Sequence, residues 1–200
     1  MEEKQTSSLH KISRIISDFF NPLVSLVLFF VYMSVHEYNI KQSLTHFLPI
    51  LLMIILPVVG WIYYHVKTGL YTNMDVSNRT QRKTLYFFIG FCVVFYILIA
   101  YLMYNQVDFV MLFILILLLA LQISNYFIKS SMHTAFNVFV AALFYNIEPY
   151  MGFLWLFIAV LVGLTRVILK RHTPKEVILG AFIAFSVSFF YLYCDIQYRN

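Results

Sequence analysis

The sequence has little charge, little glycine or proline, and only two cysteines. Charged residues make up 12% of the 200 residues, whereas a soluble globular domain has about 25%. Hydrophobic residues reach 62%, and Phe and Tyr are abundant. This composition excludes a soluble domain, a disordered chain and a collagen-like chain, and it favours a polytopic membrane protein.

The two cysteines and the basic residues exclude further classes. Cys92 lies inside an apolar run and Cys194 lies near the C-terminus, so we expect neither a structural disulfide nor a Cys/His metal site. The net charge is +5, but no basic tract lies outside the gaps between apolar runs, so we expect no nucleic-acid partner. The first twenty residues lack the apolar stretch and cleavage site of a signal peptide.

Seven apolar runs are candidates to cross a bilayer, which takes about 20 residues each. The first and fifth runs are short, so we expect six or seven spans. No internal repeat or Gly/Ser linker separates the runs. The sequence therefore predicts an all-α, polytopic transmembrane helix bundle that forms one domain over residues 21–200. The runs are Asn21–Val35, Phe47–Tyr64, Thr84–Tyr104, Phe109–Ile128, Thr134–Ile147, Gly152–Leu169 and Val177–Cys194.

Residues 1–20 are predicted to form an N-terminal interfacial segment. Leu9, Ile12, Ile15 and Ile16 recur at helical spacing, with cationic Lys11 and Arg14 between them. Such a pattern is typical of an amphipathic helix that lies at a membrane surface. The Asn-Pro pair that follows is expected to break this helix before the first span.

The lysines and arginines concentrate on one side of the predicted bundle. If seven spans alternate, twelve of the fourteen share the side of the N-terminus, and the other side keeps only Lys41 and Arg199. The positive-inside rule then puts the richer side in the cytoplasm and the C-terminus outside. The twelve are Lys4, Lys11, Arg14, Lys67, Arg79, Arg82, Lys83, Lys129, Arg166, Lys170, Arg171 and Lys175.

Three gaps on this side, residues 75–83, 129–133 and 166–176, also carry histidine, hydroxyl or carboxylate groups. Guanidinium groups match phosphate oxygens, and a helix N-terminus favours an anion. Two histidines could supply a nucleophile and a proton donor. These gaps therefore suggest an anion site, and Glu176 could hold one imidazole in the required tautomer.

Each of these residues also has a simpler interpretation. Basic residues at membrane edges commonly extend to the headgroups and set topology. Ser131 could merely cap the fifth span, and Thr173 with Glu176 forms a plain capping box. Asp75 could simply pair with Arg79 one helical turn later. The sequence alone leaves both interpretations open.

The third gap reads Thr165-Arg166-x5-His172-x3-Glu176. It resembles the Ser-Arg-x5-His-x3-Asp motif of the type-2 phosphatidic acid phosphatase family, which shares its site with the vanadium haloperoxidases. Thr stands for Ser and Glu for Asp at unchanged spacing. The stretch from His172 to Gly180 is also similar to the family's His-Thr-Pro-x-x-Val-x-x-Gly run.

The second gap resembles the family's Pro-Ser-Gly-His motif. Ser131 and His133 keep the Ser and the His, while Ser130 replaces Pro and Met132 replaces Gly. The resemblance as a whole covers roughly residues 67–180.

The first gap keeps the spacing of the family's Lys-x6-Arg-Pro motif. Arg82 stands at the arginine, Asp75 at the lysine and Lys83 at the proline. Arg79 is expected to supply the missing cation, as in family members with an Arg-x-x-Arg pattern.

The resemblance implies a metal-independent phosphatase without a cofactor. His172 would attack phosphorus and carry a phosphohistidine, Glu176 would orient His172, and His133 would protonate the leaving group. The implied partners are the lipid bilayer and a phosphorylated lipid or isoprenoid diphosphate, in a bacterial inner (plasma) membrane. The phosphate oxygens would be held by Arg82, Arg166, Ser131 and Arg79.

A second function class stays open at this point. An inactive lipid-binding or transport-type membrane protein of the same fold would also collect polar residues at span ends. Transporters commonly bind substrate near the bilayer midplane on broken helices, whereas the polar groups here lie at one face. The spatial relation of His133, His172 and Arg166 should discriminate between the two classes.

Overall fold

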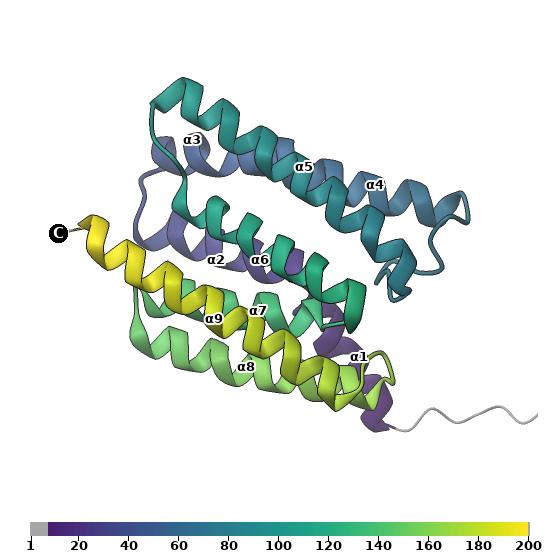
Figure 1. Ribbon diagram of the computed structural model, residues 1–200. Coiled ribbons are helices and arrows are strands. Elements are labelled where there is room, and N and C mark those ends of the chain that lie inside the picture. The colour runs from purple at the N-terminus through teal and green to yellow at the C-terminus, as the bar shows by residue number, and fades with distance from the viewer. Residues whose placement is uncertain (1–7, 200) are drawn as a thin grey trace, which may run out of the picture. The chain divides into compact units, whose positions relative to one another are not determined.

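The computed structural model describes residues 8–199, and this part of the chain is helical and contains no strand (Figure 1). It divides into two compact units. Unit 1 combines residues 8–29 with residues 130–188, and unit 2 combines residues 30–129 with residues 189–199. The all-α class predicted from the sequence is confirmed. The first seven residues of the predicted N-terminal segment, Lys4 among them, lie outside the described residues.

Helices appear wherever an apolar run was expected, with bounds that differ by several residues at some ends. In chain order they are α1 (Ser8–Phe19), α2 (Pro22–His36), α3 (Ile40–Ile50), η1 (Leu51–Ile55), α4 (Leu56–Lys67), α5 (Arg79–Tyr104), α6 (Phe109–Phe127), α7 (Met132–Tyr145), α8 (Pro149–Ile168) and α9 (Pro174–Arg199).

Among residues 8–199, five helical segments are long and apolar enough to cross a membrane, and a sixth is counted if the bent pair of α1 and α2 forms one span. The expected range of six or seven spans overlaps this count at six. The fifth predicted span corresponds to α7, which has 14 residues. At 1.5 Å per residue it is about 21 Å long, which is short of the roughly 30 Å hydrocarbon core. The five segments are Ile40–Lys67, Arg79–Tyr104, Phe109–Phe127, Pro149–Ile168 and Pro174–Gln197.

α7 forms the core of unit 1. Every residue from His133 to Phe144 is buried, which explains why a short helix can be apolar all round. α8 turns back along α7 as a helical hairpin (Figure 1). Gly152 permits this turn, because a Cβ there would lie 2.5 Å from the Cβ of Tyr145.

One polar side chain joins several segments inside unit 1. Asn137 of α7 is fully buried, and its Nδ2 donates to the carbonyl oxygens of Phe20 at 2.9 Å and His133 at 2.8 Å. Its Oδ1 accepts from Ser25 Oγ at 3.0 Å and from Trp155 Nε1 at 3.2 Å. A buried amide is stable in an apolar core when its hydrogen bonds are made. Asn137 therefore ties the start of α2 and the middle of α8 to α7.

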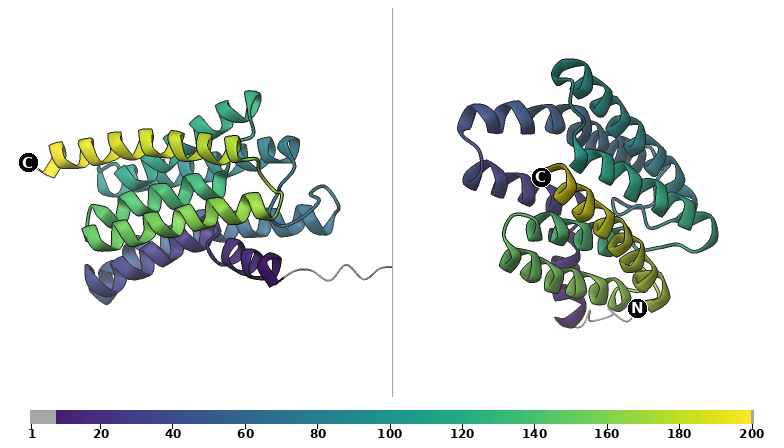
Figure 2. Two further views of the ribbon diagram at one scale, coloured as in Figure 1. Left: turned by 90° about the horizontal axis from the view of Figure 1, so that it is seen from below. Right: turned by 60° about the vertical axis from the view of Figure 1, so that its left-hand side comes forward.

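α1 packs on α8 with its serine-bearing face. Ser13 and Ser17 are buried, whereas Ile12 and Ile15 are more than half exposed. The chain bends by 55° between α1 and α2, which the two views of Figure 2 show as a change of direction of the purple ribbon. The predicted break at the Asn-Pro pair is confirmed.

The long first segment of unit 2 is continuous but irregular. α3 and α4 are joined by the π-helical turn η1 without a break in the span. This turn lies between Pro49 and Pro57. Proline cannot donate to the carbonyl four residues earlier, and helices accommodate this loss by local changes of winding.

α5 and α6 pack together in unit 2, and Arg79 fastens one end of the pair. Its Nε donates to the carbonyl of Asn125 at 2.7 Å, and its Nη2 donates to the carbonyl of Tyr126. The Asn125 Nδ2 donates to the carbonyl of Arg79 at 3.2 Å in return. A cation at the last carbonyls of a helix also interacts favourably with the helix dipole.

Candidate active site

Five of the seven predicted site residues lie in unit 1, at the ends of three helices. Ser131 and His133 stand at the start of α7, Arg166 in the last turn of α8, and His172 and Glu176 at the start of α9. In Figure 1 these three helix ends lie at the same end of unit 1, next to α1.

A backbone hydrogen bond joins the second and third motifs. The amide of Ser131 donates to the carbonyl of Glu176 at 3.0 Å. The Ser131 hydroxyl caps α7, because it accepts from the amide of Thr134 at 3.4 Å and from its hydroxyl at 3.0 Å. Ser131 is fully buried, so the capping role considered from the sequence is present. Its role toward phosphate stays a prediction.

Gly180 lets α9 approach this loop closely. A Cβ at Gly180 would lie 2.6 Å from the carbonyl oxygen and 3.0 Å from the amide nitrogen of Ser131. Gly163 of α8 has a related function, because a Cβ there would lie 2.9 Å from Val177 Cγ1 and 3.5 Å from Thr134 Oγ1. The spacing from His172 to Gly180 thus has a structural reason, since it brings the second and third motifs into contact.

His172 and Glu176 form a hydrogen-bonded pair. The distance between His172 Nδ1 and Glu176 Oε2 is 2.9 Å, and the imidazole side chain is fully buried. The same oxygen accepts from the amide of Thr173 at 3.0 Å, while Thr173 Oγ1 accepts from the amide of Glu176 at 3.3 Å. The capping box and the carboxylate–imidazole contact therefore exist together. They were alternatives when only the sequence was considered.

The loop between α8 and α9 fixes the backbone of the third motif. The amides of Arg171 and His172 both donate to the carbonyl of Arg166, at 3.0 Å and 3.2 Å. Lys170 adopts a left-handed conformation with φ of 54°, which is a common way to end a helix. The five residues between Arg166 and His172 thus close a compact turn rather than an extended linker.

Arg166 is almost fully buried, with 2% of its surface exposed. Its Nη1 donates to Ser17 Oγ of α1 at 2.9 Å. A buried guanidinium is costly unless hydrogen bonds or anions compensate its charge. The position of Arg166 therefore fits a role toward an anionic ligand.

His133 is buried on the first turn of α7. Its carbonyl accepts from Asn137 Nδ2, which fixes this turn against the core. At the start of a helix the amide dipoles also favour a negatively charged ligand. The expected proton donor thus lies two residues from Ser131, which is itself bonded to Glu176.

Arg79 and Arg82 belong to unit 2. The contacts of Arg79 with α6 favour a structural role for this residue. Arg82 is buried, and its Nε donates to the carbonyl of Val76 at 3.0 Å. Their predicted contacts with phosphate stay predictions.

Three supporting residues were missed in the sequence. Asn137 follows His133 by four residues in an apolar run, and this helical spacing was the available signal. Ser13 and Ser17 have the same spacing on α1, but only the apolar residues of that helix were interpreted. Side chains that bond across segments distant in the sequence leave no local pattern.

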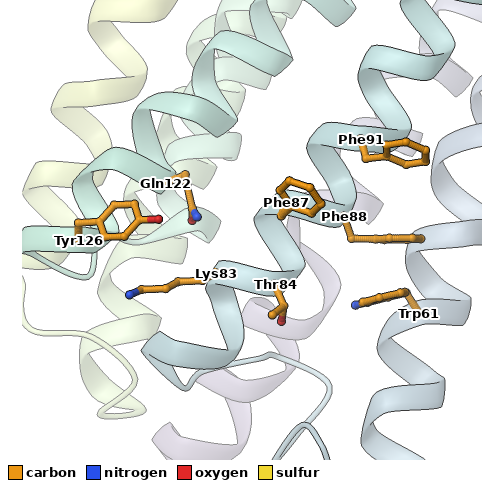
Figure 3. Close-up of a pocket in the computed structure, with 8 residues that line it drawn as sticks. All are labelled: Trp61, Lys83, Thr84, Phe87, Phe88, Phe91, Gln122 and Tyr126. Carbon is orange, nitrogen blue, oxygen red and sulfur yellow. The ribbon is translucent and has the colours of Figure 1, made fainter.

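Unit 2 contains an open groove of about 610 Å³ between α4, α5 and α6 (Figure 3). Trp61, Phe87 and Phe91 form much of its aromatic lining, and the Lys83 ammonium lies 4.7 Å from the centre of the Tyr126 ring. Aromatic walls on membrane-spanning helices suit a hydrocarbon chain. The predicted catalytic residues belong to unit 1.

The arrangement can support nucleophilic chemistry at phosphorus. A hydrogen bond from Nδ1 to a carboxylate leaves the Nε2 lone pair of a neutral imidazole available for attack. Among residues 8–199, no group of three or more His, Cys, Asp or Glu side chains is placed to hold a metal ion.

The fold and this site define a helical integral membrane protein with a histidine–carboxylate pair and a buried arginine at its helix ends. The sequence pattern of the PAP2 superfamily matches residues 124–199 of the chain. The resemblance drawn from the motifs is thereby confirmed, and the match includes the second and third motifs but not residues 75–83. It indicates phosphatase activity on phosphate esters. Searches of curated proteins and of solved structures each gave no match.

Proposed function

We propose that the protein is a membrane phosphatase that hydrolyses a lipid phosphate or an isoprenoid diphosphate through a phosphohistidine. The observation that carries this proposal is the buried His172, whose Nδ1 lies 2.9 Å from Glu176 Oε2. The superfamily match supports the class of reaction. The substrate class is supported by the position of the site at the ends of membrane-spanning helices.

The first half-reaction forms a phosphorus–nitrogen bond. Nε2 of His172 attacks phosphorus, the bond from phosphorus to the leaving oxygen breaks, and that oxygen takes a proton from His133. Glu176 stabilises the imidazolium character that develops on His172. In the second half-reaction, water gives a proton to His133 and its oxygen displaces His172. Inorganic phosphate leaves, and both histidines return to their initial states.

Charge on the transferred phosphoryl group must be stabilised at the same time. Phosphoryl transfer depends mainly on positioning and electrostatics. Arg166, buried beside the third motif, supplies forked N–H donors for this purpose, and the Ser131 region offers amides at the start of α7. Arg82 is proposed as a second cation. Arg79 has a weaker case, because its donors bind α6.

The proposal is tested by phosphate release from purified protein in bilayer discs with a panel of phosphatidate, phosphatidylglycerol phosphate and polyprenyl diphosphate. We expect turnover of at least one substrate, inhibition by vanadate, and unchanged rates in a chelator. His172→Ala should abolish turnover because it removes the nucleophile. His46→Ala, which changes an exposed histidine of α3, is the matched control.

Three outcomes would contradict the proposal. Full activity of His172→Ala would exclude the phosphohistidine. Loss of activity in the chelator, restored by a divalent ion, would exclude the metal-independent mechanism. Lipid phosphate binding without turnover of any substrate would favour an inactive lipid-binding protein of the same fold.

A further inference from the structure

In α1 the polar serine face is buried and the apolar face is exposed, which is the reverse of a helix in a soluble protein. Its buried residues are Ser13 and Ser17, while Leu9, Ile12 and Ile15 are each more than half exposed. An exposed apolar face is expected where a helix meets lipid. The serine face, by contrast, packs against α8 inside unit 1.

Ser17 makes a specific contact on that face. Its Oγ accepts a hydrogen bond of 2.9 Å from Nη1 of Arg166, although the two residues are 149 positions apart. Ser17 is fully buried and Arg166 nearly so. Bulk water therefore cannot easily replace this contact, and its loss would leave a buried guanidinium donor unsatisfied.

This contact restricts the orientation of the Arg166 guanidinium. The backbone of Arg166 is held by the compact turn before His172, but four side-chain torsions separate the guanidinium from that backbone. A planar fork recognises phosphate only in a defined orientation. The Ser17 oxygen takes one of the five N–H donors of the guanidinium and so restricts its plane.

A second hydrogen bond attaches the same N-terminal region to α7, the helix that carries His133. Asn137 Nδ2 donates to the carbonyl of Phe20, just after α1, and also to the carbonyl of His133. The end of α1 is thus bonded to α7, which carries His133, and to α8, which carries Arg166. The N-terminal helix is therefore part of the framework of the site.

We infer that Ser17 is a positioning residue of the phosphate site, which orients the Arg166 guanidinium toward the phosphoryl oxygens. This inference rests on the proposed function. Ser17 itself does not touch the substrate and acts through Arg166. α1 thereby contributes to the site: its apolar face meets lipid, and its serine face contacts Arg166.

The test compares two serines on one face of one helix. Ser17→Ala removes the acceptor, whereas Ser13→Ala removes a buried hydroxyl one turn earlier that makes no hydrogen bond to Arg166. We expect Ser17→Ala to weaken vanadate binding and raise KM by about tenfold, as for one hydrogen bond to a charged group. Ser13→Ala should change both by less than about twofold.

A double-mutant cycle separates positioning from general stability. Vanadate affinity is measured by calorimetry in bilayer discs, which requires no turnover. In an Arg166→Ala background, Ser17→Ala should change the affinity by less than about twofold, because its target is absent. Thermal unfolding of all variants is measured in parallel.

Two results would overturn the inference. One is a Ser17→Ala protein with a lowered melting temperature but unchanged vanadate affinity and KM, which would make the contact purely structural. The other is an equal loss of vanadate affinity on Ser17→Ala in the wild-type and the Arg166→Ala backgrounds. If the wild-type protein itself neither binds vanadate nor releases phosphate, it is the proposed function that fails.

Discussion

At the scale of single residues, Glu176 makes two contacts through one oxygen atom, one for a helix cap and one for the proposed role toward His172. Oε2 accepts from the Thr173 amide, which caps α9, and contacts Nδ1 of His172. A capping box needs only an acceptor at this position. Stabilisation of an imidazolium needs a negative charge. A substitution that keeps the acceptor and removes the charge therefore separates the two functions.

Glu176→Gln should lower the turnover number by one to two orders of magnitude, because the amide cannot stabilise a cationic imidazole. The amide oxygen still caps α9, so the melting temperature should change little. Steady-state kinetics and thermal unfolding of the purified variant measure the two effects. An unchanged turnover number would reduce Glu176 to a helix cap.

The third motif shows which contacts the spacing of residues in the sequence can predict. Its spacing predicted both the capping box and the pairing of His172 with Glu176, because all these contacts lie within four residues. The contacts of Arg166 with Ser17 and of Asn137 with Phe20 were not predicted. They join segments more than one hundred residues apart, and no local spacing encodes them.

At the scale of helices, the close approach of α9 to the start of α7 shapes the site. Gly180 allows this approach, since a Cβ would lie 2.6 Å from the Ser131 carbonyl oxygen. That oxygen belongs to backbone that caps α7 and cannot move aside easily. Gly180 is required because a side chain there would clash with Ser131, and not because its backbone angles exclude other residues.

Gly180→Ala should therefore destabilise the protein by about 1–3 kcal/mol, the usual cost of overpacking, and should lower activity by displacing the start of α9 from Ser131. Gly90→Ala is the matched control in α5, because a Cβ there meets nothing within 4 Å. That control should be neutral or slightly stabilising. Unfolding and phosphate release are measured for both variants, and equal behaviour of the two would refute the packing argument.

Helix α7 shows that hydropathy alone does not distinguish a lipid-facing helix from one buried in protein. Its sequence is as apolar as a membrane span, but His133 to Phe144 are buried within unit 1. An apolar run indicates that a helix lies away from water, and either lipid or a protein core can surround it. Length was the signal that separated the two cases, and the fifth run was indeed the short one.

At the scale of the whole molecule, the distribution of cations over seven alternating runs predicts which side of the membrane the motifs face. Twelve of the fourteen Lys and Arg residues lie on the predicted motif side, and nine remain when Arg79, Arg82 and Arg166 are set aside for phosphate. A cytoplasmic motif face stays a prediction from the positive-inside rule. α9 is a single candidate span between His172 and the C-terminus.

A reporter fused after Asn200 tests this orientation. We expect activity of an alkaline-phosphatase-type reporter, which works only outside the cytoplasm. A fluorescent protein at the same position should stay dark if it is exported unfolded. Cytoplasmic fluorescence without phosphatase reporter activity would place the motif face outside.

The sequence by itself determined the helical membrane class, the motif spacing and the local pairing at the start of α9. Each depends on composition or on contacts within a few residues of each other, which a linear pattern records. The tertiary structure decided that α7 is a buried core helix, that Ser131 lies against Glu176 and Gly180, and that α1 contacts Arg166. These depend on which distant segments pack together, and only the closure of the chain brings them into contact.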